Sequence, residues 1–335
     1  MSIEVYDKKN KQYIERMDKI LEELPASVSQ FIMATEGSLL PRTSYGYVCD
    51  IRNFYKYLLN NNPNFTEYKN ITDEDLNNLN SFDFDEYLYQ IRQHTDHVTE
   101  SRKISAIKAY FNYLIDRKYI TNKDALGIKH PKKRRDKNIT YMDREEINNL
   151  LDSIETGENL LGKQRKYHQK EMQRDIAIIA VLLGTGIRVS ECANLDINDI
   201  NLDKCYLTVV GKRKKIRSVY FSDTVKYYLS AYIAIRKSTE TDEKDALFIS
   251  RNLTRLSERS IQKLVKKYAV PEVVGTKHIT PHKLRSSFGT AMLEQSNDIA
   301  TVADILGHDS ISTTKQYYAQ VQKEASIKAG RNGIF

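Results

Sequence analysis

Apolar positions recur with helical spacing through most of the first 120 residues. One such stripe follows the helix-start signal Pro41-Arg42-Thr43, and a second spans residues 104–114. Both stripes are most simply the buried faces of core helices, and a cofactor site is the weaker interpretation. This part of the chain is therefore predicted to be a helical domain.

The pattern breaks between residues 121 and 140, a polar stretch that contains Gly127, Pro131 and a basic run. Helical patterning resumes at Tyr141, in a helix start with acidic residues in its first turn. We therefore expect a helical domain at 1–120, a basic linker at 121–140 and a second domain at 141–335. Segment 155–174 is polar and charged, and its pattern does not decide between loop and helix.

A continuous apolar run at residues 176–183 predicts a buried helix. Gly184 is expected to end that helix in a left-handed conformation. Arg188 would then emerge from a tight Gly-x-Gly turn that is anchored on a buried element. The alternative is a surface arginine that opens the next helix and pairs with Glu191.

Strand-forming residues gather in two runs, 205–210 and 216–221, with Gly211 and a basic stretch between them. This pattern predicts a β-hairpin. Lys212 directly follows Gly211 at the strand end, where its side chain could swing into a groove and reach a phosphate ester. A positively charged surface turn is the simpler alternative.

Near the C-terminus, Thr280-Pro281 is a helix start. His282 and Arg285 follow three positions apart, so they share one helix face, and His282 lies in the first turn, which favours an anion. A short helix at about 298–306 should end before His308. The alternative is a helix-turn-helix whose histidines are only structural.

Two adjacent tyrosines, Tyr317 and Tyr318, come next. Neighbouring side chains on a helix point about 100° apart, so only one of the two can face a phosphate. Two arginines, two histidines and a tyrosine suit one task, which is to grip a phosphodiester and break it with a phenolic oxygen.

Composition supports a polyanionic partner, because 52 Lys+Arg against 44 Asp+Glu give a net charge of +8. Three widely spaced cysteines argue against a disulfide framework and against a cysteine-based metal site. The charged N-terminus has no export signal, and the longest apolar run is too short to cross a bilayer. We expect a cytoplasmic protein that does not contact membranes.

Taken in order, these residues resemble the active-site pattern of the tyrosine recombinase family, in the style of phage integrases and single-protein Xer recombinases. The pattern of Arg, Lys, His-x-x-Arg, His and Tyr is matched by Arg188, Lys212, His282, Arg285, His308 and Tyr317. The flanking Gly-x-Arg-x-Ser-Glu, Leu-Gly-His and Ser-Thr-Thr elements agree as well. Ser286-Ser287 depart from the His-Thr that Xer proteins often have, at positions that are not catalytic.

The resemblance implies a mainly α fold with a small β-sheet or hairpin. It implies a two-domain, C-shaped DNA clamp, made of a helical core-binding (SAM-like) domain and a mixed α/β catalytic domain. Arg188 and Arg285 would clamp the phosphate with His308 as a further donor, and His282 and Lys212 would be general base and general acid. The nucleophile would be Tyr317, which stands nine positions after the histidine of Leu-Gly-His, as in the family.

The resemblance also implies site-specific recombination through a 3′-phosphotyrosyl intermediate and a Holliday junction, for chromosome dimer resolution or mobile-element integration and excision. Neither a metal ion nor a cofactor is implied. The implied partner is double-stranded DNA with an inverted-repeat core site, bound by a homotetramer on two sites with a dimer on each. The candidate DNA-contacting residues are Thr43, Tyr47, Arg102, Ser105, Lys108, Lys133 and Arg134. A type IB topoisomerase-like enzyme and a non-catalytic DNA-binding protein are the alternatives.

Overall fold

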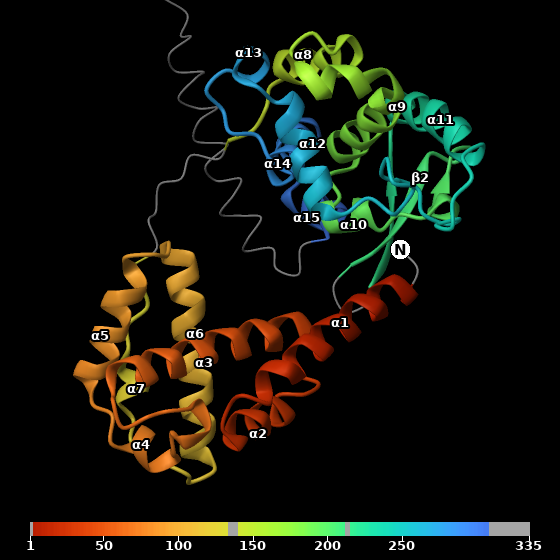
Figure 1. The fold of residues 1–335 in the computed structure, drawn as a ribbon. Helices are drawn as coiled ribbons and strands as arrows, with labels where there is room; N and C mark the ends of the chain where they lie inside the picture. Colours follow the sequence, from red (N-terminus) through yellow and green to blue (C-terminus); the bar gives the residue numbers. More distant parts are fainter. Residues whose placement is uncertain (1–2, 133–139, 212–214, 308–335) are drawn as a thin grey trace, which may run out of the picture. The chain divides into compact units, whose positions relative to one another are not determined.

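The computed structural model of the chain describes residues 3–132, 140–211 and 215–307 (Figure 1). The chain divides into two compact units, Tyr6–Asp136 and Lys137–Phe335, and the second unit also takes in Met1–Val5. The two units have separate hydrophobic cores. Helices predominate and one small sheet is present, so the predicted mainly α composition is confirmed. None of the helices in the described ranges is both long and apolar enough to span a membrane.

The N-terminal unit is built from helices packed around an aromatic core. In chain order its elements are α1 (Ile3–Leu21), α2 (Ala26–Ala34), α3 (Pro41–Asn61), the 3-10 turn η1 (Tyr68–Asn70), α4 (Asp73–Asn77), α5 (Ser81–Arg92), α6 (His97–Asp116) and α7 (Asp124–Gly127). Helices α3 and α6 pack against each other and carry the two predicted apolar stripes (Figure 1). Phe54, Ile104 and Phe111 are almost fully buried, which confirms that these stripes are core.

Two tyrosine hydroxyls within this core, those of Tyr55 and Tyr110, are hydrogen-bonded to each other. The Tyr110 hydroxyl is hydrogen-bonded to the hydroxyl of Tyr55 at 2.9 Å and to that of Ser27 at 2.8 Å. A buried hydroxyl without a partner costs free energy. The hydrogen bonds between Ser27, Tyr110 and Tyr55 avoid that cost, so the two tyrosine rings can be buried in the core.

The second unit combines helices with a three-stranded sheet. Its elements are α8 (Arg144–Thr156), α9 (Gly162–Thr185), α10 (Val189–Ala193), the 3-10 turn η2 (Ile197–Asp199), β1 (Ile200–Asn201), β2 (Tyr206–Val210), β3 (Ile216–Tyr220), α11 (Asp223–Lys237), α12 (Glu258–Tyr268), α13 (Pro271–Val274), α14 (Pro281–Ser296) and α15 (Ile299–Leu306). The hairpin of β2 and β3 and the helix before His308 were both predicted and are confirmed. The short strand β1, which pairs with β2, had no signal in the sequence.

The long helix α9 runs through the middle of this unit and packs against α8, α11 and α14 (Figure 1). Its C-terminal half is buried on all sides, as the apolar run predicts. The undecided segment 155–174 includes the first half of α9. There, Glu171 accepts a hydrogen bond from Arg251 Nε at 3.3 Å and pairs with Lys267, whose Nζ lies 3.6 Å from Glu171 Oε2. These interactions stabilise the polar end of a helix that periodicity could not predict.

The predicted role of Gly184 as the helix end is wrong. Gly184 lies inside α9, where a Cβ would come within 2.3 Å of Val225 Cγ2, so this glycine permits close packing of α11. Gly186 ends the helix instead, with φ of 60° and its N–H donating to Leu182 O at 3.2 Å. The left-handed cap is therefore two residues later than expected.

Sheet pairing fixes which hairpin residues face the core. In the β2–β3 ladder Val209 pairs with Arg217 and Leu207 with Val219. Beyond the strands, Gly211 N–H donates to Lys215 O at 2.7 Å and closes the hairpin.

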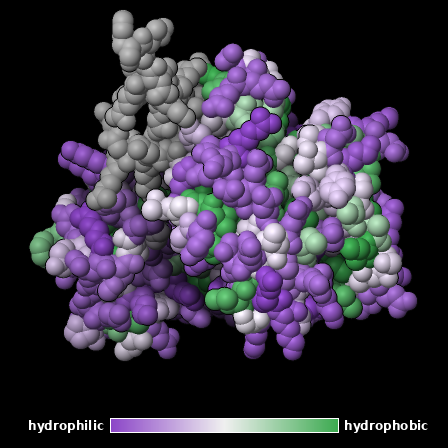
Figure 2. All heavy atoms as spheres, turned by 90° about the horizontal axis from the view of Figure 1, so that it is seen from above, coloured by the Kyte–Doolittle hydropathy of each residue, from purple (hydrophilic) through white to green (hydrophobic). Residues whose placement is uncertain are grey.

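Figure 2 shows that the visible face of the molecule is mostly hydrophilic, with small hydrophobic patches between polar side chains.

Candidate active site

Arg188 is presented by the turn between α9 and α10. The left-handed Gly186 reverses the chain, Ile187 is fully buried, and Arg188 is the N-cap residue of α10. The Arg188 backbone N–H donates to Glu191 Oε2 at 2.7 Å, and its Nη1 donates to Glu191 Oε1 at 3.0 Å. The pairing with Glu191, which the sequence offered as an alternative to a functional role, is thus present. It fixes Arg188 while leaving the side chain partly exposed.

Arg285 lies on the first turns of α14 and is almost completely buried. As predicted, the helix begins at Thr280-Pro281, and the Thr280 hydroxyl caps it by accepting from Lys283 N–H. Arg285 Nη1 donates to Gly186 O at 2.6 Å, and its Nη2 donates to Leu306 O. A buried guanidinium is thus held by backbone carbonyls from two separate turns.

The two arginines meet at the end of α15. Arg188 Nη2 donates to Gly307 O at 2.8 Å, and Arg285 Nη2 donates to the carbonyl of the preceding residue, Leu306. Residues nearly a hundred positions apart in the chain therefore bind neighbouring carbonyls. Two guanidinium groups in one place form a site that favours an anion with several oxygens.

His282 lies one turn before Arg285 on α14 and is exposed to solvent. Partial burial of the ring lowers the pKa of His282 below its usual 6.5, and the positive charges of Arg285, Lys283 and Arg188 lower it further. The imidazole is therefore neutral at pH 7 and is able to accept a proton. The structure brings three of the predicted catalytic residues together, namely Arg188, His282 and Arg285.

The other three predicted catalytic residues, Lys212, His308 and Tyr317, lie outside the described residues. Gly211 directly follows β2. Gly307, whose carbonyl binds Arg188, directly precedes His308 in the sequence. Among the described residues there is no cluster of His, Cys, Asp and Glu that could hold a metal ion.

Two residues at this site were not predicted to belong to it. Glu191 is 3% exposed and binds Arg217 of β3, whose Nη1 and Nη2 donate to its two carboxylate oxygens at 2.9 Å each. Burial acts to raise the pKa of Glu191, but the hydrogen bonds and charges of Arg217 and Arg188 outweigh it, so the pKa is lowered. The spacing of Arg188 and Glu191 was a usable signal, whereas the contact with Arg217 depends on the hairpin register.

The predicted DNA-contacting residues of the N-terminal unit gather on α3 and α6. Arg102 is partly exposed and pairs with the buried carboxylate of Asp50, which also binds Lys103 at 3.5 Å. Burial raises the pKa of Asp50, while the charges of Arg102 and Lys103 oppose this. Ser105 donates its hydroxyl hydrogen to Ser101 O at 2.9 Å.

Thr43 of α3 is exposed, and Tyr47 of α3 and Lys108 of α6 are partly exposed. Lys133 and Arg134 lie outside the described residues.

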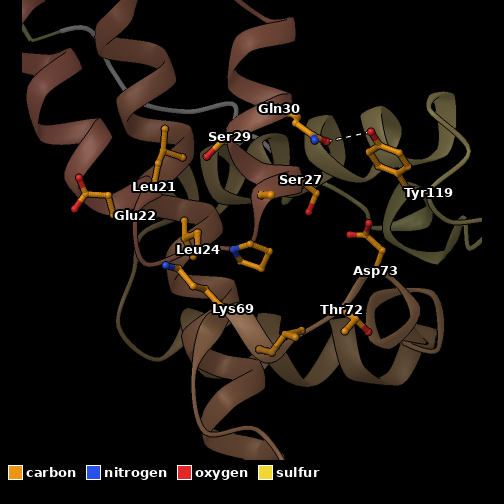
Figure 3. Close-up of a pocket in the computed structure, with 13 residues that line it drawn as sticks. Leu21, Glu22, Leu24, Ser27, Ser29, Gln30, Lys69, Thr72, Asp73 and Tyr119 are labelled. Carbon is orange, nitrogen blue, oxygen red and sulfur yellow. Dashed lines mark hydrogen bonds between the residues drawn. The ribbon is translucent and has the colours of Figure 1, made fainter.

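A surface hollow of about 770 Å³ lies in the N-terminal unit, beside the turn between α1 and α2 (Figure 3). At its rim the Tyr119 hydroxyl donates to Gln30 Oε1 at 3.0 Å. None of the predicted site residues lines this hollow. It does not combine a nucleophile with a proton acceptor of shifted pKa, so the candidate active site remains the arginine cluster.

Residues 140–325 match the phage integrase family. This segment contains all the residues described around Arg188 and Arg285, and the chain belongs to this family. The resemblance noted in the sequence is thereby confirmed.

The relatives include tyrosine recombinase XerC of Vibrio vulnificus (strain YJ016), which is 34% identical over 217 residues, or 64% of this chain and 64% of that protein. The match thus spans slightly less than two thirds of the Vibrio protein. Tyrosine recombinase XerC of Caldanaerobacter subterraneus subsp. tengcongensis is 30% identical over 315 residues, which cover 88% of this chain and 82% of that protein.

Among solved structures, XerH site-specific recombinase bound to palindromic difH substrate in a post-cleavage complex is similar, with a TM-score of 0.66. The identity is 18%, and the alignment covers 94% of this chain and 88% of that one. This similarity shows that the fold is shared.

Proposed function

We propose that this chain is a site-specific DNA recombinase that cuts and rejoins DNA through a tyrosine. The observation that carries the proposal is the convergence of Arg188 and Arg285 on the carbonyls of Gly307 and Leu306. The names of the XerC relatives support the same function.

The two arginines would bind the nonbridging oxygens of the scissile phosphate. A phosphodiester repels nucleophiles, and its transition state carries more negative charge, so preorganised guanidinium donors lower the barrier. Their attachment to backbone carbonyls holds them in place before DNA arrives. His308 would add a further hydrogen-bond donor.

Cleavage needs a nucleophile and two proton transfers. The Tyr317 hydroxyl oxygen would form a bond to phosphorus while the bond from phosphorus to the 5′ oxygen breaks. His282, neutral because of its lowered pKa, would take the phenolic proton, which a group with a pKa of about 10 retains at pH 7. Lys212 would give a proton to the leaving 5′ oxygen.

The product would be a 3′-phosphotyrosyl link and a free 5′ hydroxyl. A 5′ hydroxyl from a second duplex reverses the reaction and joins the strands in a new order, by way of a Holliday junction. The intermediate conserves the energy of the phosphodiester bond, so strand exchange needs neither ATP nor hydrolysis.

We assign residues 1–120 to DNA binding and 141–335 to catalysis, with a basic linker at 121–140. Exposed Arg102, anchored on Asp50, and the neighbouring polar side chains of α3 and α6 support a phosphate-contacting face. The partners would be duplex DNA with inverted repeats and three further copies of this chain, in the cytoplasm.

Covalent trapping tests this function. The full chain is incubated with nicked duplexes selected from random-sequence DNA by their binding to it, and protein–DNA adducts are resolved by denaturing electrophoresis. We expect adducts with the wild type and with Tyr318→Phe, the matched control, but none with Tyr317→Phe. Adduct formation by Tyr317→Phe would refute the assignment of the nucleophile. The absence of an adduct with the wild type would leave a non-catalytic DNA-binding protein.

A second assay separates a recombinase from a type IB topoisomerase. The wild-type chain is given a plasmid with two copies of the selected site and, separately, a supercoiled plasmid without the site. We expect recombinant products from the first plasmid only. Relaxation of the second plasmid without any recombination would favour the topoisomerase.

A further inference from the structure

Arg217 connects the hairpin to the arginine cluster. It lies on β3, opposite Val209, and its side chain is 15% exposed. Both of its terminal nitrogens donate to Glu191, one to each oxygen, at 2.9 Å. Such two-point ion pairs are stronger and more directional than single contacts.

The carboxylate of Glu191 is shared between two arginines. Its Oε1 accepts from Arg188 Nη1 at 3.0 Å as well as from Arg217 Nη1. A buried carboxylate beside Arg188 alone would cancel the positive charge that a phosphate needs. Arg217 supplies the opposite charge at the same carboxylate, so the field of Arg188 persists.

Arg217 also touches the turn that precedes His308. A Cβ on Gly307 would lie 3.0 Å from Arg217 Cζ and 3.1 Å from its Nε, so a side chain at this position would crowd the guanidinium. The carbonyl of the same glycine binds Arg188. Strand β3, the start of α10 and the end of α15 therefore meet around one side chain.

We propose that Arg217 is a positioning residue of this active site, which balances Glu191 so that Arg188 stays available to the scissile phosphate. The inference rests on the proposed recombinase function and deepens it. Because Arg217 belongs to β3, the same contact ties the placement of this strand to that of the arginine clamp.

Charge counting gives the proposal a distinctive signature. Arg188, Arg285 and Arg217 carry three positive charges, and Glu191 carries one negative charge. Arg217→Gln removes a positive charge and frees the carboxylate to neutralise Arg188. Adding Glu191→Gln restores the original net charge. If Arg217 were only a structural brace, the second substitution would make the defect worse.

The test is a double-mutant cycle on single-turnover adduct formation by the full chain, with DNA affinity and thermal unfolding measured in parallel. We expect Arg217→Gln to slow adduct formation about 10- to 100-fold, with DNA affinity within about 3-fold of the wild type. The double variant should react faster than Arg217→Gln. In the Glu191→Gln background, Arg217→Gln should change the rate by less than about 3-fold.

A matched control is Arg255→Gln, which breaks a different arginine–carboxylate pair of this unit, the one with Asp196. Its rate, once folded, should stay near that of the wild type. An Arg217→Gln rate within twofold of the wild type would overturn the inference, as would a double variant slower than the single one. If Arg217→Gln does not fold, the comparison within the Glu191→Gln background still decides, because a large loss there overturns the inference. Failure of the wild type to form adducts would overturn the proposed function instead.

Discussion

Arg285 is hydrogen-bonded to the turn that presents Arg188, since its Nη1 donates to the carbonyl oxygen of Gly186 at 2.6 Å. The turn that presents one proposed phosphate-binding arginine, Arg188, is thus hydrogen-bonded to the other, Arg285. Any change that moves Gly186 displaces both guanidinium groups together, so the two arginines act as a single unit.

The first prediction concerns this turn. In Gly186→Ala the new Cβ would lie 2.3 Å from Phe288 Cδ1 and 2.9 Å from Leu306 Cδ2, at a φ of 60°. Strain and overlap should cost about 2–4 kcal/mol of unfolding free energy in urea, and adduct formation by the folded protein should fall at least about 100-fold. Gly127→Ala, where no atom lies within 4 Å of the new Cβ, is the control. Wild-type cleavage by Gly186→Ala would show that the turn does not set the site.

The second prediction is a pH dependence. Because the pKa of His282 lies below 6.5, its base form is present at neutral pH and is lost only on acidification. The second-order rate constant at sub-saturating DNA, which reports groups of the free protein, should rise with pH and level off with a midpoint below 6.5. His282→Gln should be slow and should lack this rise. A midpoint above 6.5, or the same rise in His282→Gln, would exclude His282 as the base.

The third prediction separates two neighbours on α6. Arg102→Ala should weaken DNA binding about 3- to 10-fold and reduce the slope of log affinity against log salt by about 1, because one phosphate contact is lost. Ser105→Ala should leave both unchanged, since the Ser105 hydroxyl hydrogen is already donated to Ser101 O. Fluorescence anisotropy over a salt series measures both quantities. An unchanged affinity and salt slope in Arg102→Ala would mean that this face does not contact the backbone as proposed.

The fourth prediction concerns Ser287, at the departure from the usual Xer sequence. Its hydroxyl accepts from the buried N–H of Met142 at 2.8 Å and donates to Lys283 O at 2.9 Å. Ser287→Ala leaves that N–H without a partner and should cost about 1–3 kcal/mol in urea unfolding. Ser286→Ala, which removes only a bond to the carbonyl of its own helix, should cost less. Equal losses would show that the Met142 contact contributes nothing.

Local signals in the sequence predicted much of this structure. The stripes of α3 and α6, the apolar run of α9 and the Thr280-Pro281 start of α14 each depend on residues within one element. The order of Arg188, His282 and Arg285 predicted a cluster that the structure brings together. The remaining predicted catalytic residues lie outside the described part of the chain, so their placement stays a prediction.

What the sequence could not predict depends on contacts between elements. Gly184 and Gly186 are equally able to end a helix, and the packing of Val225 against Gly184 decides between them. In the sequence, Arg217 is one of several basic residues of the hairpin. Only the strand register in the structure places its side chain beside Glu191. In the polar half of α9, Glu171 pairs with Lys267 of α12, and no window of local sequence contains both residues.

The left-handed glycines that end α9 and α15 have a consequence for protein engineering. Gly186 and Gly307 offer their carbonyls to Arg285 and Arg188, so the anchors of the site are main-chain atoms. A designer who wished to transplant this site to another scaffold would have to copy the course of two loops. Grafting the charged side chains alone would omit the carbonyls to which Arg188 and Arg285 are hydrogen-bonded.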